Sequence, residues 1–235
     1  MNSMAIAIAV GYGLAALSIL GRRQLREPWL IAAIAGGAIA FPIALLLATP
    51  IQQLFASIFG WDMGAYTTNL GVGLVGVITS AVVNQILKLS PALLIWSFSG
   101  ERGDALAFGA ASGAGFAIVG AYQVIFLALM ARALPIGSQG GFEVSLAHQF
   151  AFVLTSVATT ALAAYGTTRK NIGPYLALAI AGDSLFNTLG LLFTLRLYTN
   201  VVWTALSIGV ALALLGYAFA LSLRSSASGP PPAVS

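Results

Sequence analysis

The chain has 235 residues, of which 59% are hydrophobic and only 7% charged, and its formal net charge is +4. A water-soluble protein carries about 25% charged residues, so this composition excludes a soluble domain and predicts a protein whose main solvent is the lipid bilayer. The absence of Cys excludes disulfides, thiolate-bound zinc and a thiol nucleophile, and the single His excludes any site built from two imidazoles.

Seven segments are apolar enough to cross a bilayer, since a transmembrane helix needs about 20 apolar residues. All of them should be helical, because a backbone surrounded by lipid must satisfy its own hydrogen bonds. The sequence therefore predicts an all-α, polytopic membrane protein in which residues 1–223 form a single bundle. The predicted spans are 4–20, 29–48, 70–98, 105–130, 149–166, 175–195 and 201–223.

The charge distribution predicts how the bundle is oriented. Arg22, Arg23 and Arg26 directly follow the first span, and no cleavage site precedes them, which favours a retained span over a cleaved signal peptide. If this loop is cytoplasmic, the alternation of spans places seven basic residues inside and two outside, as the positive-inside rule requires. The N-terminus is then outside and the C-terminus is cytoplasmic.

Two segments outside the spans have distinct compositions. Apolar residues repeat at helical spacing over 50–59, where Thr49 and Pro50 suit a cap and first turn and Gly60 suits a stop. This pattern predicts an interfacial helix on the outer membrane surface, acting either as a packing element over the mouth of the bundle or as a gate. The segment 224–235 is rich in Ser, Gly and Pro, which predicts a disordered cytoplasmic tail.

Two ionisable residues, Lys88 and Asp183, fall inside predicted spans. Such residues are costly in a membrane and are by default candidates for a functional site. Counted from the cytoplasmic ends of their spans, the two lie at similar depths, roughly 15 Å and 12 Å at a rise of 1.5 Å per residue. We therefore expect the Asp183 carboxylate to lie near the Lys88 amine, facing the interior of the bundle.

Three predicted helices each carry two polar residues four positions apart at this depth, so each pair lies on one helical face. These faces could form an internal cavity for a catalytic group, a substrate or an ion, or they could provide hydrogen bonds that fix the bundle. The polar-cavity candidates are Asn84, Gln85, Lys88, Ser156, Thr160, Asp183 and Asn187.

Other residues are interpreted as structural. His148 lies at the outer end of the fifth span and is interpreted as an interfacial side chain. The span 105–130 carries small residues at spacings of four, which permit close helix approach and place this helix in the centre of the bundle. The helix-packing glycines are Gly109, Gly113, Gly115 and Gly120.

The run Asp104-Ala-Leu-Ala-Phe-Gly109, followed by Gly113-Ala-Gly115-Phe116, carries a family resemblance. It is similar to a motif of the PrsW-type intramembrane proteases, in which an Asp, a Gly five residues later and a Gly-x-Gly-Phe lead to a Glu. That superfamily also takes in YhfC-like and CAAX-protease-like proteins and, more distantly, the Aph scaffold subunit of gamma-secretase. The family's Glu position is Gly120 in this chain.

The resemblance extends from about residue 70 to 195, but the catalytic side chains differ. Asn84-Gln85-Ile86-Leu87-Lys88 stands where the family has Glu-Glu-x-x-Lys, so the Lys is kept and both carboxylates are amides. Ser156 and Thr160 stand at the family's first His and its partner, and Asp183 and Asn187 at the second. Both histidines are therefore absent.

These departures predict a relative that kept the polar centre and lost hydrolysis. Peptide hydrolysis needs a general base and an electrophilic stabiliser, and zinc needs at least three strong protein ligands. We therefore expect no metal, no cofactor and no confident catalytic residue. The closest analogy that the resemblance implies is the Aph subunit, a scaffold that holds other membrane proteins.

Three functional hypotheses follow. The first is a non-catalytic scaffold or accessory subunit whose partners are the lipid bilayer and another membrane protein, with no nucleic acid. The second is an intramembrane protease with a rearranged site, in which Asp183 is the base and Lys88 or Asn84 positions the scissile carbonyl. The third is a small-solute or ion transporter that uses Lys88 and Asp183 as a charged relay, with Pro91 breaking the third span locally. The resemblance implies the plasma membrane of a bacterium or archaeon.

Overall fold

The computed structural model describes residues 2–20, 28–99, 105–133 and 141–227, and these are arranged in eight helices with no strand among them. Seven of the helices are long and apolar enough to cross a membrane, so the chain is a multi-pass membrane protein of the all-α class. The helices are α1 (Asn2–Leu20), α2 (Pro28–Phe59), α3 (Ala65–Thr68), α4 (Leu70–Phe98), α5 (Ala105–Ala133), α6 (Gly141–Thr168), α7 (Ile172–Thr194) and α8 (Asn200–Ala227).

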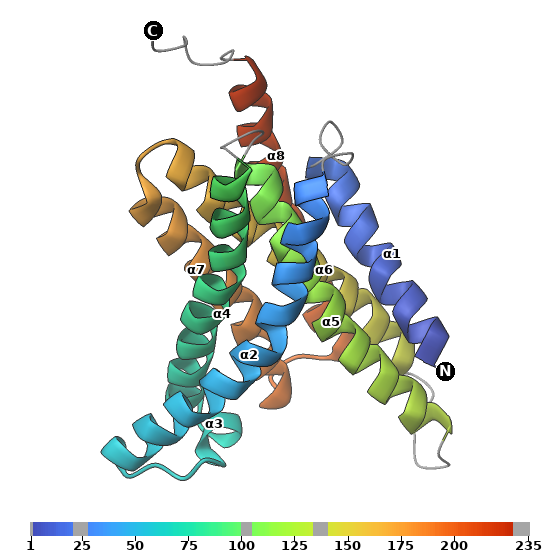
Figure 1. Ribbon diagram of the computed structural model, residues 1–235. Helices are drawn as coiled ribbons and strands as arrows, with labels where there is room; N and C mark the ends of the chain where they lie inside the picture. Colours follow the sequence, from blue (N-terminus) through green and yellow to red (C-terminus); the bar gives the residue numbers. More distant parts are fainter. Residues whose placement is uncertain (1, 21–27, 100–104, 134–140, 228–235) are drawn as a thin grey trace, which may run out of the picture.

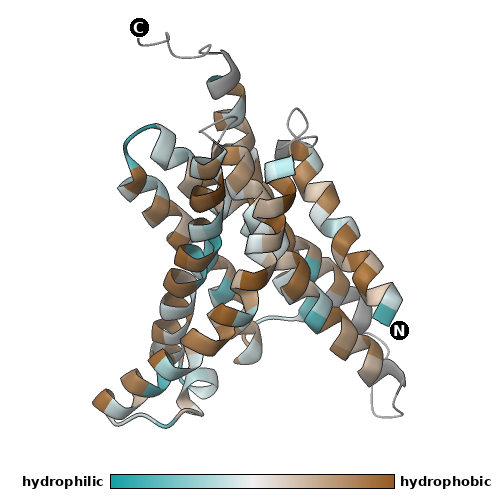
Figure 2. Ribbon diagram, in the orientation of Figure 1, coloured by the Kyte–Doolittle hydropathy of each residue, from teal (hydrophilic) through white to brown (hydrophobic). Residues whose placement is uncertain are grey.

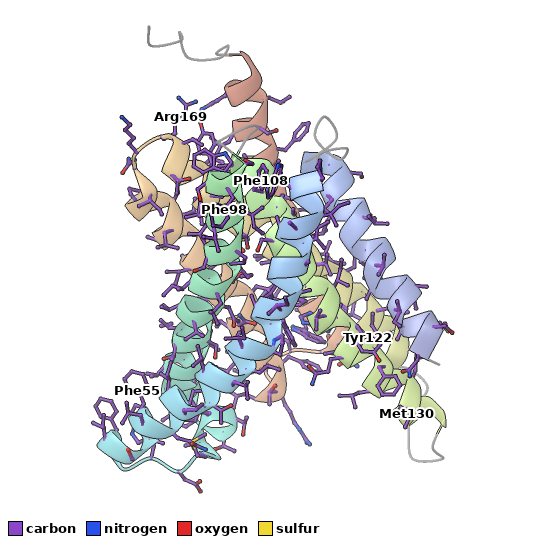
Figure 3. The ribbon with its side chains drawn as sticks, in the orientation of Figure 1. Phe55, Phe98, Phe108, Tyr122, Met130 and Arg169 are labelled. Atoms are coloured by element: carbon purple, nitrogen blue, oxygen red, sulfur yellow. The ribbon has the colours of Figure 1, made fainter. Side chains whose placement is uncertain are left out.

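The seven long helices alternate in direction along one axis (Figure 1). α1 begins at the lower end of the view and α8 ends at the upper end, as expected for an odd number of crossings. Figure 2 shows hydrophobic residues over most of the long helices, with hydrophilic residues at helix ends and at a few turns inside the bundle. In Figure 3, Phe55 and Met130 lie on opposite sides of the lower end, whereas the buried Phe108 lies among the helices of the upper half.

The centre of the bundle is formed by α5 together with α6. The sequence predicted α5 as the central helix, and residues 105–117 of α5 are indeed all buried. α6 is nevertheless the more enclosed of the two, with 83% of its membrane-span window buried against 50% for α5. The physical reason is that α6 packs against α1, α4, α5, α7 and α8, and its small residues, such as Ala158 and Ala161, allow neighbours on every side.

Glycines bring the backbones of α5 and its neighbours into direct contact. A methyl group added at Gly113 would lie 2.5 Å from the Ser156 carbonyl oxygen of α6, and one added at Gly109 would lie 2.6 Å from that of Thr160. On the other side, Gly115 faces the Ile34 carbonyl of α2. The prediction that these glycines pack helices together is confirmed.

The predicted interfacial helix over 50–59 is wrong as a separate element, and the predicted span 29–48 is too short. The structure has one continuous helix, α2, with Pro42 and Pro50 inside it. A proline removes one hydrogen bond from the helix ladder, and membrane helices tolerate that loss when neighbouring groups compensate for it. The helix ends where predicted, at Gly60, whose φ of 68° is one that glycine adopts readily.

Polar side chains fix the last turns of α2 against its neighbours. The Tyr66 hydroxyl of α3 donates to the Gln52 carbonyl over 2.9 Å, and the Gln52 side chain donates to the Ser80 hydroxyl of α4 over 3.0 Å. α4 itself begins at Asn69, whose side-chain oxygen accepts hydrogen bonds from two backbone N–H groups of the first turn. It then continues through Pro91 to Phe98, so Pro91 does not interrupt the third span.

Several predictions fall wholly or partly on other parts of the chain. α8 continues to Ala227, so the first four residues of the predicted disordered tail are helical, and 228–235 lie outside the described residues. The loop residues Arg22, Arg23 and Arg26, on which the orientation depends, and Asp104 of the family motif also lie outside them. The orientation of the bundle therefore stays a prediction.

Candidate functional site

A buried ion pair joins α4 to α7 in the interior of the bundle. The Lys88 Nζ atom lies 2.5 Å from Asp183 Oδ2, and the two side chains are only 2% and 7% exposed. Among the described residues this is the only ion pair. The prediction that the carboxylate lies near the amine and faces the interior is confirmed.

Two further side chains hold the carboxylate. Gln85 donates from Nε2 to Asp183 Oδ2 over 2.7 Å, and the Thr159 hydroxyl donates to Oδ1 over 3.0 Å. Gln85 Nε2 also lies 2.7 Å from Thr159 Oγ1. Asp183 thus accepts from three side-chain donors, and these connect α4, α6 and α7 at one level. We call Gln85, Lys88, Thr159 and Asp183 the polar cluster.

The sequence places these side chains together through helical spacing. Gln85 and Lys88 are three residues apart on α4 and therefore share a face. Phe116 of α5 covers the lysine, with Nζ 5.4 Å from the centre of its ring, which is within the range of a cation–π contact. The Ser112 hydroxyl of α5 donates to the Lys88 carbonyl over 2.6 Å, in the turn that precedes Pro91.

Burial decides what this arrangement costs. Removing two charges from water is expensive, and their mutual attraction repays the loss only when the geometry is good and further hydrogen bonds satisfy the remaining atoms. Gln85 and Thr159 supply those hydrogen bonds to the carboxylate. The carboxylate is therefore well satisfied, while the Lys88 amine has Asp183 as its only hydrogen-bond acceptor among the described residues. Removing either charge would leave the other without compensation.

Four of the predicted cavity residues lie outside the polar cluster. Asn84 and Asn187 are half-buried, and neither side chain hydrogen-bonds to another residue in the described ranges. Ser156 donates to the Gly113 carbonyl over 3.1 Å, and Thr160 donates to the Ser156 carbonyl over 2.8 Å. These two hydroxyls serve helix packing. In place of the expected Asn84 and Lys88, it is Gln85 and Lys88 of α4 that contact Asp183.

Thr159 is the member that sequence reasoning missed. It belongs to a run of hydroxyl residues on α6, Thr155, Ser156, Thr159 and Thr160, in which two pairs at a spacing of four were possible. The family spacing selected Ser156 and Thr160, but it is Thr159, of the other pair, that hydrogen-bonds to Asp183. No signal in the sequence separates Thr159 from Thr160, because the two are adjacent on one helix.

The position at which the resembling family has a Glu is closed by aromatic rings. A methyl group added at Gly120 would lie 2.7 Å from Phe41 Cε2 and 3.0 Å from Phe152 Cε1. A carboxylate side chain does not fit there without displacing both rings. Within the described ranges there is also no group of three His, Cys, Asp or Glu residues able to hold a metal ion.

A second set of polar atoms lies nearer the lower end of the bundle. His148 is partly buried, with its ring 4.0 Å from that of Trp203 and 5.0 Å from that of Phe186, measured between ring centres. Trp203 in turn stacks on Phe193 at 4.3 Å. His148, which the sequence interpretation places at the membrane interface, packs between the rings of Phe186 on α7 and Trp203 on α8.

The fold and the polar cluster define a multi-pass membrane protein with an ion pair sequestered at its centre. Comparison of the chain with models of known protein families, with curated proteins and with solved structures finds no match. The resemblance to PrsW-type proteins therefore rests on motif spacing alone.

Proposed function

We propose that this protein is a non-catalytic scaffold or accessory subunit of a membrane complex, related to the PrsW-type proteases but without their hydrolytic chemistry. We place it in the plasma membrane of a bacterium or archaeon, with the N-terminus outside and the C-terminus in the cytoplasm. The observation that carries this proposal is the state of Asp183. Its carboxylate accepts from Lys88, Gln85 and Thr159 together.

The geometry argues against the rearranged protease. A general base needs lone pairs directed toward the proton that it removes, whereas three of the about four lone pairs of the Asp183 carboxylate are directed to protein donors. Gly120, at the family's Glu position, is covered by Phe41 and Phe152, and Asn84 makes no hydrogen bond to the polar cluster.

A transporter is supported less well than a scaffold. The charges of Lys88 and Asp183 neutralise each other at 2.5 Å, so the site presents no net charge to a substrate ion. α4 is continuous through Pro91, whereas transporters often bind substrates at broken helices. The pair instead acts as a connection between α4 and α7.

The outer surface offers a means of docking other membrane proteins. α2 and α8 expose rows of large apolar side chains, including Leu46 at 73% and Val201 at 73% of their surface. Such surfaces are suited to lipid or to another transmembrane helix, and close packing of small residues would strengthen the second contact. Gly209 and Gly216 of α8 have nothing within 4 Å of an added methyl group, so a partner helix could approach α8 closely there.

Purification in a mild detergent tests the scaffold proposal. We expect another membrane protein to co-purify at a fixed stoichiometry, and we expect Gly209→Leu to weaken its retention while leaving the fold intact. Gly11→Leu on α1, where an added methyl group also meets nothing, is the matched control. A lone monomer would contradict the proposal. So would cleavage of a membrane-embedded peptide by the purified protein that is lost in Asp183→Asn but kept in Asn84→Ala.

A further inference from the structure

Two adjacent basic residues, Arg169 and Lys170, lie in the short turn between α6 and α7. α6 ends at Thr168 and α7 begins at Ile172, and both helices are long and apolar enough to cross the membrane. Because the turn is so short, the two basic side chains lie directly at the edge of the hydrocarbon layer, where the lipid headgroups begin. Figure 3 shows Arg169 at this upper end of the bundle.

The Arg169 guanidinium is held in place by an aromatic side chain. Its Nε atom donates to the Tyr165 hydroxyl over 2.9 Å, and its Cζ atom lies 5.3 Å from the centre of the Tyr165 ring. Tyr165 is only 4% exposed, and its ring packs edge-on against that of Tyr175, with 5.3 Å between the ring centres. A flexible side chain is thereby held in one orientation, so less conformational entropy is lost when it binds a ligand.

The remaining N–H groups of Arg169 have no acceptor among the described residues. Its Nε atom makes the one hydrogen bond of this side chain, and the residue is exposed at the surface. A guanidinium presents its donors in a planar fork that matches two oxygens of a phosphate. Arg169 therefore presents the donor arrangement that phosphate recognition uses, at the depth where lipid phosphates lie.

Lys170 occupies a backbone position that glycine fills more easily. Its φ is 53°. Its N–H donates to the Thr167 carbonyl over 3.1 Å, and the Asn171 N–H donates to the Gly166 carbonyl over 3.0 Å. These are the two hydrogen bonds of a Schellman motif, in which the residue at this position is usually glycine because other residues are strained there. The chain thus has a second positive charge beside Arg169 where an uncharged residue would give a more stable turn.

Apolar side chains continue from this turn along the exposed side of α7. Leu178 and Leu185 are seven residues apart and therefore share a helical face, and they are 39% and 51% exposed. Ile172, in the first turn of the helix, is 40% exposed. A phospholipid whose phosphate lies at the turn can lay its acyl chains along this face, and a free phosphate ion cannot use it.

We propose that the α6–α7 turn binds an anionic phospholipid. The Arg169 guanidinium contacts the phosphate, Lys170 adds positive charge, and the acyl chains lie against Leu178 and Leu185. In the orientation proposed above, the loops on this side of the membrane carry seven basic and three acidic residues, which is complementary to a negative headgroup. The site does not depend on the scaffold role, because it requires a lipid and no partner protein.

Lipid titration followed by native mass spectrometry tests the site on the intact protein. Phosphatidylglycerol, which is anionic, is compared with phosphatidylcholine, whose headgroup also carries a positive charge. We expect the first to bind about tenfold more tightly, because choline adds a like charge beside the two basic residues. Equal binding of the two lipids would overturn the proposal. So would displacement of phosphatidylglycerol by an equal concentration of inorganic phosphate, since the acyl chains would then contribute nothing.

Charge and hydrogen bonding at the turn are tested separately. Arg169→Gln should weaken phosphatidylglycerol binding about tenfold, which corresponds to one charge-assisted hydrogen bond. Arg224→Gln is the matched control, since it removes the same charge near the upper end of α8 and should weaken binding less than about twofold through screened, long-range attraction. Equal losses in the two variants would show that only total charge attracts the lipid. Tyr165→Phe keeps every charge but removes the hydroxyl that holds Arg169, so unchanged binding in this variant would contradict the fixed guanidinium.

Lys170→Gly distinguishes lipid binding from an effect on folding, because the two should change in opposite directions. Without added lipid, the unfolding temperature should rise, since glycine adopts this backbone conformation without strain. Phosphatidylglycerol should nevertheless bind more weakly, because one positive charge is lost from the turn. A Lys170→Gly variant that is more stable and binds this lipid as tightly as the native protein would overturn the site, even if Arg169→Gln failed to fold.

Discussion

The two sides of α6 contact the neighbouring helices through different groups. Toward α5, the contact is between backbones, with Gly109 and Gly113 set against the carbonyl groups of Thr160 and Ser156. Toward α7 and α8, the contacts are made by side chains: the Thr159 hydroxyl donates to Asp183, and the His148 ring packs against Phe186 and Trp203. One interface is close-packed and uncharged, whereas the other includes a hydrogen bond from Thr159 to the charged Asp183.

This difference separates two sources of structural specificity in a membrane, where burial of apolar groups gives helices no preference for each other over lipid. Packing between α5 and α6 depends on complementary shape, so its stability should be sensitive to added side-chain volume. The contacts with α7 depend on charge and hydrogen bonding, so their stability should be sensitive to the loss of one hydrogen-bonding or charged side chain. Substitutions that change only one of these properties can therefore distinguish the two interfaces.

The largest effect is expected where a buried charge loses its partner. Lys88→Met should lower the free energy of unfolding by about 3–5 kcal/mol, because Asp183 would remain buried without its counter-charge. Unfolding in mixed detergent and denaturant measures this loss. The double variant Lys88→Met with Asp183→Leu should recover most of it, and a double variant as unstable as the single one would show that the pair is not the source of the effect.

Added volume on the α5 side is expected to have a smaller cost. Gly113→Ala places a methyl group 2.5 Å from the Ser156 carbonyl oxygen, so α5 and α6 must separate, at a cost of about 1–3 kcal/mol. Gly11→Ala is the control, since its added methyl group meets nothing, and it should be neutral or slightly stabilising. Equal unfolding curves for the two variants would mean that α5 and α6 are not in close contact.

The hydroxyl of Thr159 tests the hydrogen bonds of the charged side without changing its charge. Thr159→Val should cost about 1–2 kcal/mol, because Asp183 loses one of its donors inside the bundle. Thr160→Val is the matched control, because it makes the same chemical change at the next residue. The Thr160 hydroxyl hydrogen-bonds only within its own helix, so this variant should lose less stability. The order of the two unfolding midpoints is the readout, and a reversed order would remove Thr159 from the polar cluster.

The smallest effect is expected at the amides outside the polar cluster. Asn84→Ala and Asn187→Ala should each change the free energy of unfolding by less than about 0.5 kcal/mol, since neither side chain bonds to a described residue. Thermal unfolding in detergent measures this directly. A loss as large as that of Thr159→Val would place Asn84 in the polar cluster after all.

The helices and the ion pair could be predicted from the sequence. The rotation of each helix about its own axis, which decides which side chains face a neighbour, could not. Span length and apolar content identify membrane helices, and helical rise gives the depth of a residue, which was enough to bring Lys88 and Asp183 to one level. Depth does not fix the rotation of a helix about its axis. Asn84 and Gln85 lie at nearly the same depth but about 100° apart around α4, and only packing against α6 and α7 selects Gln85.

The same limit explains the errors on α6 and α2. Thr159 and Thr160 are neighbours at one depth, and the choice between them depends on where α7 lies. Over 49–60, Thr49, Pro50 and Gly60 are typical of a separate short helix, and local sequence does not reveal that Tyr66 and Ser80 bond to Gln52 and keep the longer helix in place.

The length of α2 has a consequence for the surrounding bilayer. Its 32 residues span about 48 Å at the helical rise, whereas the hydrocarbon layer is about 30 Å thick. The excess turns carry apolar side chains such as Leu54 and Ile58, which are 58% and 64% exposed. The helix must therefore tilt or draw lipid up around its lower end, and this hydrophobic mismatch favours a thicker membrane for this protein.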